Sequence, residues 1–220
     1  MRRRTSLTTA TCALAAATLL LTACGGGGDD KKIGAEDSGT SAPAPSASTT
    51  TAAPTTSAPA GPTFDFPPDV KVVVDADTTG DAVKDAVLRD QGYGLNSVYV
   101  ALGKDDPDEP LLQKYLTGTA LEIWSESISA GKKQHLTATG DLHFYNRKVT
   151  SVDAKTAGVT FCEDQRYSYN KHTDTGRIDK TTPSLNSFVS HTAFMRKAAD
   201  GTWQMADYKS QRGAASCRVS

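Results

Sequence analysis

The chain has 220 residues, with 24 Lys and Arg side chains against 25 Asp and Glu side chains, so its net charge is close to zero. Nucleic-acid binding calls for a basic surface, and this charge balance therefore predicts no nucleic-acid partner. The length fits one domain with additional segments.

The first 23 residues have the three parts of a secretory signal. Arg2 to Arg4 form a positive n-region, Leu7 to Leu21 form an apolar h-region, and small residues follow. The h-region is shorter than the roughly 20 apolar residues that a membrane-spanning helix needs. Leu21-Thr22-Ala23-Cys24 resembles a bacterial lipobox, which implies cleavage before Cys24 and its lipidation by a thioether-linked lipid and palmitate. The alternative is an ordinary secreted protein with a Cys near its signal.

Residues 24–62 are expected to form the lipidated Cys24 and a disordered tether. From Ser38 to Pro62 the chain consists of Ser, Thr, Ala, Pro and Gly. Such a segment cannot bury enough apolar surface to offset the entropy lost on ordering. We interpret it as a spacer between the extracytoplasmic face of the cell membrane and a single domain at residues 63–220. A low-complexity segment that serves only solubility is the alternative, and its composition also permits O-glycosylation.

The first half of the domain is expected to hold an edge strand and then helices. Residues 70–74 have extended character. Residues 82–102 carry apolar side chains at helical spacing, and an internal Gly-Tyr-Gly leaves open one kinked helix or two. Residues 111–128 repeat this spacing, with a break expected at Gly118 and an end at Gly131.

Beyond residue 131 the apolar residues alternate with period two, which is typical of strands. Asp200-Gly201 is a hairpin signal between the last two of them, and residues 171–183 are polar and predict an exposed loop. Helices followed by an antiparallel meander predict an α+β fold, with N-terminal helices packed on one face of a curved antiparallel sheet. The expected strands are residues 136–145, 149–152, 159–162 (continued by 166–169), 187–196 and 202–209.

Two cysteines remain for the domain, because Cys12 belongs to the signal and Cys24 is the lipid site. Cys162 and Cys217 predict a disulfide, since the compartment beyond the membrane is oxidising. A zinc site is the alternative, but neither Cys-x-x-Cys nor a close His pair accompanies them. No metal and no cofactor is predicted.

Residues 78–218 resemble the nuclear transport factor 2-like superfamily, the cone-shaped fold shared with polyketide-cyclase-like proteins. Two N-terminal helical segments precede an antiparallel sheet that ends in Ala-Asp-Gly-Thr-Trp and a Tyr-bearing last strand, and these features carry the likeness. More narrowly, the chain is similar to exported lipoproteins of high-GC Gram-positive (actinobacterial) bacteria that carry such a domain behind an Ala/Ser/Thr/Pro tether. The residues that carry this narrower likeness are Val159–Asp164, Asp200–Met205 and Cys217. The resemblance implies a cone with a pocket. It implies little about activity, since this fold hosts isomerases, dehydratases and transport adaptors.

Three polar residues on one strand could be mistaken for a catalytic group. Asp141, His143 and Tyr145 share one face of residues 136–145, but Leu142 and Phe144 occupy the other face, which the helices should cover. The three polar side chains are therefore expected to point outward, into solvent.

The pocket lining is expected to include Trp124, His191, Trp203 and Tyr115. His191 shares a strand face with Val189 and other apolar residues. We therefore expect a buried, hydrogen-bonded core histidine rather than a catalytic base. No phosphate loop, His-x-x-x-His or Gly-x-Ser-x-Gly motif is present in the sequence, and no catalytic residue is assigned.

The leading interpretation is a non-catalytic envelope lipoprotein, anchored to the membrane through Cys24, whose domain binds an envelope protein partner or a small apolar ligand. One alternative is an isomerase or hydro-lyase that uses His191 with a carboxylate. Another is a structural accessory subunit of an envelope complex. An open cavity with a His or carboxylate pointing in favours the enzyme, and an apolar cavity favours the ligand binder.

Overall fold

The computed structural model describes residues 61–219, so the signal, Cys24 and nearly all of the tether expected from the sequence lie outside the described residues. In residues 61–219 the chain forms three α-helices, six strands and two short 3₁₀ helices. In chain order these are β1 (Val70–Val74), α1 (Ala82–Lys104), α2 (Pro110–Tyr115), α3 (Gly118–Lys133), β2 (Leu136–Val152), β3 (Thr156–His172), β4 (Ile178–Asp179), η1 (Leu185–Ser187), β5 (Phe188–Lys197), β6 (Trp203–Arg212) and η2 (Ala215–Cys217).

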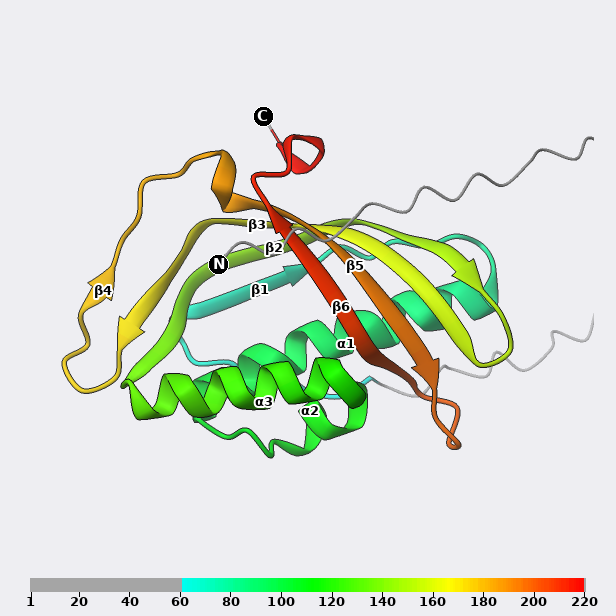
Figure 1. The fold of residues 1–220 in the computed structure, drawn as a ribbon, viewed down its shortest axis with the longest axis horizontal. Helices are drawn as coiled ribbons and strands as arrows, with labels where there is room; N and C mark the ends of the chain where they lie inside the picture. The colour runs from blue at the N-terminus through cyan, green and yellow to red at the C-terminus, as the bar shows by residue number, and fades with distance from the viewer. Residues whose placement is uncertain (1–60, 220) are drawn as a thin grey trace, which may run out of the picture. The chain divides into compact units, whose positions relative to one another are not determined.

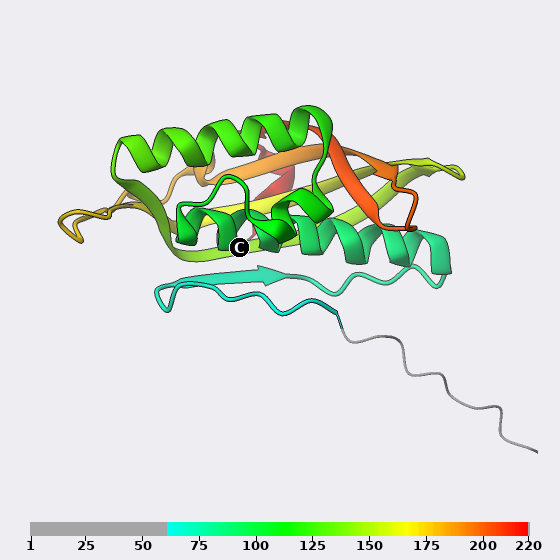
Figure 2. The ribbon, with the colours of Figure 1, turned by 90° about the horizontal axis from the view of Figure 1, so that it is seen from below.

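The strands form one sheet in the order β1-β2-β3-β5-β6, and β4 pairs with β3 beside this path (Figure 1). Figure 2 shows the domain from the helix side, with α1 and α3 lying across the strands. We call the face that these helices cover the inner face of the sheet and the opposite face the outer face. The α+β class predicted from the sequence, with helices packed on a curved sheet, is confirmed.

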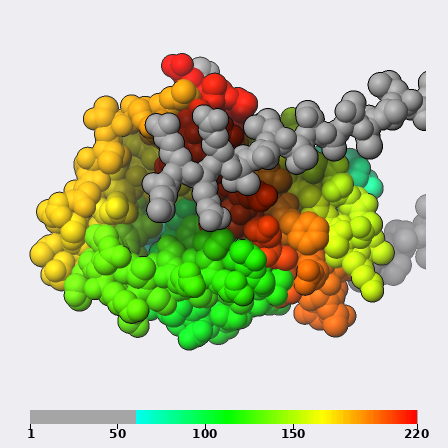
Figure 3. Space-filling view, viewed as in Figure 1, coloured from blue at the N-terminus to red at the C-terminus, as the bar shows by residue number. Residues whose placement is uncertain are grey.

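The sheet differs from the expected meander at its edge. β1 pairs in parallel with β2, whereas the other pairs are antiparallel. All three helices lie between β1 and β2 in the chain, and such a long crossover is what a parallel pair requires. The other edge is β6, which the hairpin turn at Asp200-Gly201 joins to β5 as predicted. In Figure 3 this orange-to-red hairpin borders the green surface of the helices.

β2 and β3 are two long strands where the sequence predicts several short ones, and each has 17 residues. Their pairing shifts register at three places, and such bulges bend and twist a strand without ending it. Gly140 has φ 92° and lies within β2. A Cβ there would collide with the carbonyl oxygen of Tyr167, so only glycine fits.

α1 is a single helix, which resolves the alternative left open by its Gly-Tyr-Gly. Asp81 caps its start by accepting hydrogen bonds from the backbone N–H groups of Val83 and Lys84 at 2.9 and 3.1 Å. Gly92 is buried, and a Cβ there would lie 3.2 Å from the guanidinium of Arg147. The glycine therefore permits close packing against β2.

α2 and α3 are separated at Gly118, as the sequence predicts. Gly118 has φ 53°, the left-handed region that a side chain disfavours. α3 continues to Lys133, two residues beyond the end expected at Gly131, and Gln134 caps it through its backbone N–H. Among the described residues, none of the helices combines the length and the apolar character needed to cross a membrane.

The outer face carries the predicted disulfide. Cys162 of β3 is joined to Cys217 of η2, with their Cα atoms 5.4 Å apart. Phe188 and Ala214 are buried against this bond, so the C-terminal tail is packed onto the sheet. The disulfide predicted from the sequence is confirmed.

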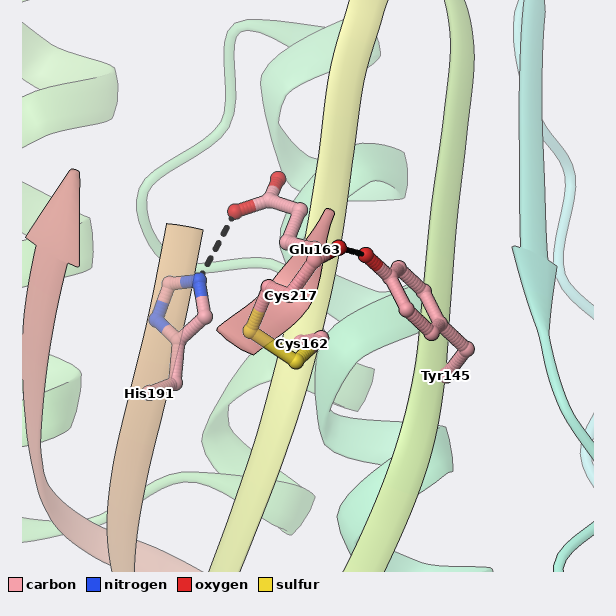
Figure 4. The surroundings of a disulfide bond; sticks show 5 residues. All are labelled: Tyr145, Cys162, Glu163, His191 and Cys217. Carbon is pink, nitrogen blue, oxygen red and sulfur yellow. Dashed lines mark hydrogen bonds and ion pairs between the residues drawn. A yellow bond between two sulfur atoms is a disulfide. The ribbon is translucent and has the colours of Figure 1, made fainter. Parts of the chain in front are cut away.

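The expectation that Asp141, His143 and Tyr145 all point into solvent is wrong for Tyr145. It lies on that face with Asp141 and His143, but its residue surface is only 8% exposed, because the tail covers it. Its hydroxyl donates a hydrogen bond to the backbone carbonyl of Cys217 (Figure 4). Asp141 is exposed and His143 is half-buried, with its Nε2 2.7 Å from Asp75 Oδ1.

Candidate functional site

A cavity of about 210 Å3 lies between α1, α3 and the inner face of the sheet. Nine of its 14 lining residues are apolar or aromatic: Leu95, Val98, Tyr99, Trp124, Phe144, Phe161, Val189, Met205 and Tyr208. It is smaller than the roughly 300–1,000 Å3 pockets that hold drug-sized ligands. An engineered apolar cavity of about 150 Å3 binds benzene. The volume therefore suits a ligand of one or two rings.

Three polar side chains meet at this cavity, and we call them the Tyr99–Glu163–His191 cluster. His191 Nε2 lies 2.9 Å from Glu163 Oε2, and the two side chains are 9% and 5% exposed (Figure 4). The hydroxyl of Tyr99 donates to Glu163 Oε1 at 3.1 Å. Each carboxylate oxygen thus has one partner from the protein. A carboxylate offers about four acceptor sites, so it can accept a further bond from a ligand.

The strand register explains why these residues meet. Phe161 of β3 pairs with His191 of β5, and Glu163 lies two residues further along β3, on the same inner face. The ring of Phe161 stacks on His191, with centroids 4.6 Å apart and planes 8° apart. Cys162 lies between Phe161 and Glu163 and points to the outer face, into the disulfide. The sheet and the disulfide together therefore restrain the strand that carries Glu163.

The protonation of the cluster follows from burial and charge. Burial raises the pKa of Tyr99 well above its usual range, and the negative charge of Glu163 raises it further, so Tyr99 remains a hydrogen-bond donor. A carboxylate only accepts, so Nε2 of His191 must carry the proton in their hydrogen bond. His191 Nδ1 is buried and has no hydrogen-bond partner among residues 61–219.

The cavity ends at an aromatic pair on its α3 side. The rings of Trp124 and Tyr208 stack with centroids 6.0 Å apart and planes 10° apart. Burial, and then the charge of Glu163, raise the pKa of Tyr208. Gln165, Ser210 and Arg212 complete the polar part of the lining.

The structure brings together only two of the four residues expected to line the pocket. Trp124 and His191 line the cavity. Tyr115 and Trp203 do not, because their side chains fill the hydrophobic core, where they are 4% and 1% exposed. Tyr115 packs against the ring of Tyr93 at 5.4 Å instead.

Sequence reasoning missed Tyr99 and Glu163. The signal for Glu163 was present in the strand alternation, since a residue two positions after Phe161 must share its inner face. Tyr99 lies on the apolar stripe of α1 and carried no separate signal. In the part of the chain that the structure describes, no three His, Cys, Asp or Glu side chains converge as a metal site would require.

No protein-family model matches the chain, and no curated protein matches its sequence. Among solved structures, it is similar to the intermembrane-space region of the chloroplast protein ARC6, at 16% identity over 56% of this chain and 92% of that chain, with a TM-score of 0.39. It is also similar to a ketosteroid isomerase-like protein from Erwinia carotovora atroseptica, at 17% identity over 57% and 95% of the two chains, with a TM-score of 0.37.

A third similar structure is a nuclear transport factor 2-like superfamily protein from Salmonella enterica. It is 13% identical over 55% of this chain and 87% of that chain, with a TM-score of 0.36. Identities and TM-scores at this level do not transfer an activity to this chain.

Proposed function

We propose that this chain is a lipid-anchored protein of the extracytoplasmic membrane face whose domain binds a small, mostly apolar ligand in the 210 Å3 cavity. The observation that supports the proposal is the composition of the cavity, in which apolar and aromatic side chains outnumber the polar ones and the one carboxylate, Glu163, can accept a further hydrogen bond. A ligand with an aromatic or alicyclic ring system and one hydroxyl group matches this cavity. The ring system would replace water against the apolar side chains, and the hydroxyl would donate to Glu163.

Ligand binding can be tested with 2-naphthol, a two-ring phenol, titrated into the full chain and followed by isothermal titration calorimetry. We expect binding that is lost in Val98→Phe, because Val98 lines the cavity and a larger ring would fill it. Val83→Phe is the matched control, since Val83 lies on the same helix and is 48% exposed.

Folding of the variants is checked by circular dichroism. If Val98→Phe fails to fold, Glu163→Gln serves instead. It keeps the side-chain shape, replaces one acceptor oxygen by an NH2 donor, and should weaken binding. Equal binding by wild type and a folded Val98→Phe variant would overturn the cavity as the binding site.

The anchor is tested separately. If Cys24 is lipidated, the protein should remain in the membrane fraction of intact cells, and Cys24→Ala should block cleavage after Ala23 and change that retention. A Cys24→Ala protein of unchanged size with unchanged retention would contradict the anchor and leave the cavity proposal untouched.

A second candidate function is acid–base catalysis, favoured by the hydrogen bond between His191 and Glu163. A carboxylate that accepts from one imidazole nitrogen orients the ring and leaves the other nitrogen basic, as a general base requires. An isomerase or hydro-lyase would use this base to remove a proton next to a carbonyl group. The test is deuterium exchange at the α-carbon of 2-tetralone in D2O, followed by NMR. Exchange above background that His191→Asn abolishes would support the enzyme, and exchange at the background rate would exclude it for this ketone.

A further inference from the structure

A groove of about 720 Å3 lies beside the cavity, between α3 and the segment that carries β4 and η1. In Figure 3 its two walls are the green surface of α3 and the gold surface of residues 170–187, with a recess between them. Tyr99, Trp124, Gln165 and Arg212 line both the groove and the cavity. The groove is much larger than the cavity, and the other 17 of its 21 lining residues do not line the cavity.

Neutral polar side chains dominate the groove. Eleven of its 21 lining residues are Ser, Thr, Asn or Gln. Among them Gln134, Asn170, Thr182 and Asn186 are exposed, so their amide and hydroxyl groups are accessible to a ligand. Such groups both donate and accept hydrogen bonds, which matches a ligand made of hydroxyl and amide groups.

The groove offers little net charge. Only Asp179 and Arg212 among its lining residues are charged, and they have opposite signs. Asp179 is engaged by His172, whose Nε2 lies 2.9 Å away, and by Arg177. Arg212 Nη1 donates to the backbone carbonyl of Asn186 at 3.3 Å. A strongly charged ligand would leave most of its charge unpaired here, so the lining selects a neutral one.

Aromatic rings supply the remaining element of recognition. Trp124 and Tyr169 are both partly exposed and both line the groove. The flat face of an indole or phenol packs well against an apolar surface while its polar end hydrogen-bonds. A pyranose ring presents both kinds of surface, since its C–H groups form an apolar face and its hydroxyls surround the edge.

We propose that this groove binds a neutral oligosaccharide, with a sugar ring packed on Trp124 and the neighbouring hydroxyls bound by side chains such as Asn170 and Thr182. The rival occupant is a neutral peptide. The oligosaccharide fits better because its many hydroxyls match the many amide and hydroxyl side chains, whereas a peptide has one donor and one acceptor per residue in its backbone. This site does not rest on the ligand proposed for the cavity.

The test is isothermal titration of the full chain with three neutral probes: hexa-N-acetylchitohexaose, maltohexaose and mannohexaose. We expect at least one to bind, and we expect the Asn170→Ala, Thr182→Ala double variant to bind it at least tenfold more weakly. Thr192→Ala is the matched control, because Thr192 is exposed on the outer face of β5 and should bind as wild type does. Val98→Phe should lose 2-naphthol and keep the sugar, which separates this site from the cavity.

Three results would overturn the proposal. These are no binding of any of the three sugars at millimolar concentration, equal sugar binding by a folded double variant, or binding of a neutral Ser/Thr/Ala hexapeptide by a chain that binds none of the sugars. Circular dichroism establishes that each variant is folded.

Discussion

On the inner face of β3, Phe161 and Glu163 line a cavity, whereas on the outer face of the same strand Cys162 is bonded to Cys217 under the C-terminal tail. Around Cys162 the outer face is covered by the tail and closed by the disulfide, whereas around Glu163 the inner face keeps space. The difference indicates a division of roles. The outer face contributes stability, and the inner face is available for a ligand.

The largest expected effect is loss of the disulfide, which tests the role of the outer face. The two cysteines are 55 residues apart in the chain, and a bridge of that span contributes up to about 4 kcal/mol in the chain-entropy model. The Cys162→Ser, Cys217→Ser double variant should therefore lose a large part of its unfolding free energy. Urea denaturation measures it, and reduction of the wild type should give the same shift. An unchanged midpoint would mean that the tail contributes nothing.

The next largest effect is expected for Glu163→Ala on the inner face. The variant leaves the Tyr99 hydroxyl and the His191 N–H buried without an acceptor, and we expect a loss of about 3 kcal/mol. Asp164→Ala is the control on the outer face, where the partner Arg166 is 28% exposed and can turn to water, and about 1 kcal/mol is expected. If Glu163→Ala and Asp164→Ala lost the same unfolding free energy, the Tyr99–Glu163–His191 cluster would not be more tightly coupled than the outer-face pair.

A smaller effect is expected for Tyr145→Phe, which removes only the hydrogen bond to the carbonyl of Cys217. We expect a loss of about 1 kcal/mol in denaturant unfolding. The same substitution at Tyr167, which is 54% exposed on β3, should change stability little. If Tyr145→Phe lowered the free energy of unfolding no more than Tyr167→Phe does, the tail would not be held through Tyr145.

The smallest effects are expected for the exposed polar residues of β2. Asp141→Ala and His143→Ala should each change the unfolding free energy by about 0.5 kcal/mol, because surface substitutions rarely do more. The ion pair of His143 with Asp75 adds little, since both side chains are more than 40% exposed and screened by water. A loss of several kcal/mol on thermal or urea unfolding would mean that these residues are structural.

The sequence was a good guide wherever a local pattern determines the structure. Alternation around Leu142 placed Asp141, His143 and Tyr145 on the outer face, Asp200-Gly201 marked the hairpin, and the two domain cysteines predicted their bond. Helical spacing located α1, and Gly118 located the break before α3.

What the sequence did not provide depends on residues far apart in the chain. Tyr99 and Glu163 are 64 residues apart, and only the packing of α1 on the sheet brings them together. Tyr145 is covered by a tail 72 residues away, which no local pattern around it reveals. Trp203 and Tyr115 were expected at the pocket because they are large and aromatic, a property that core and pocket residues share.

The most direct test of the cavity is a crystal structure of the chain soaked with 2-naphthol. We predict density for the two rings between Phe144, Phe161 and Met205, with the hydroxyl within hydrogen-bond distance of Glu163. Density for the probe only on the protein surface, with the cavity containing water at saturating probe concentration, would contradict the proposal that the inner face binds a small apolar ligand.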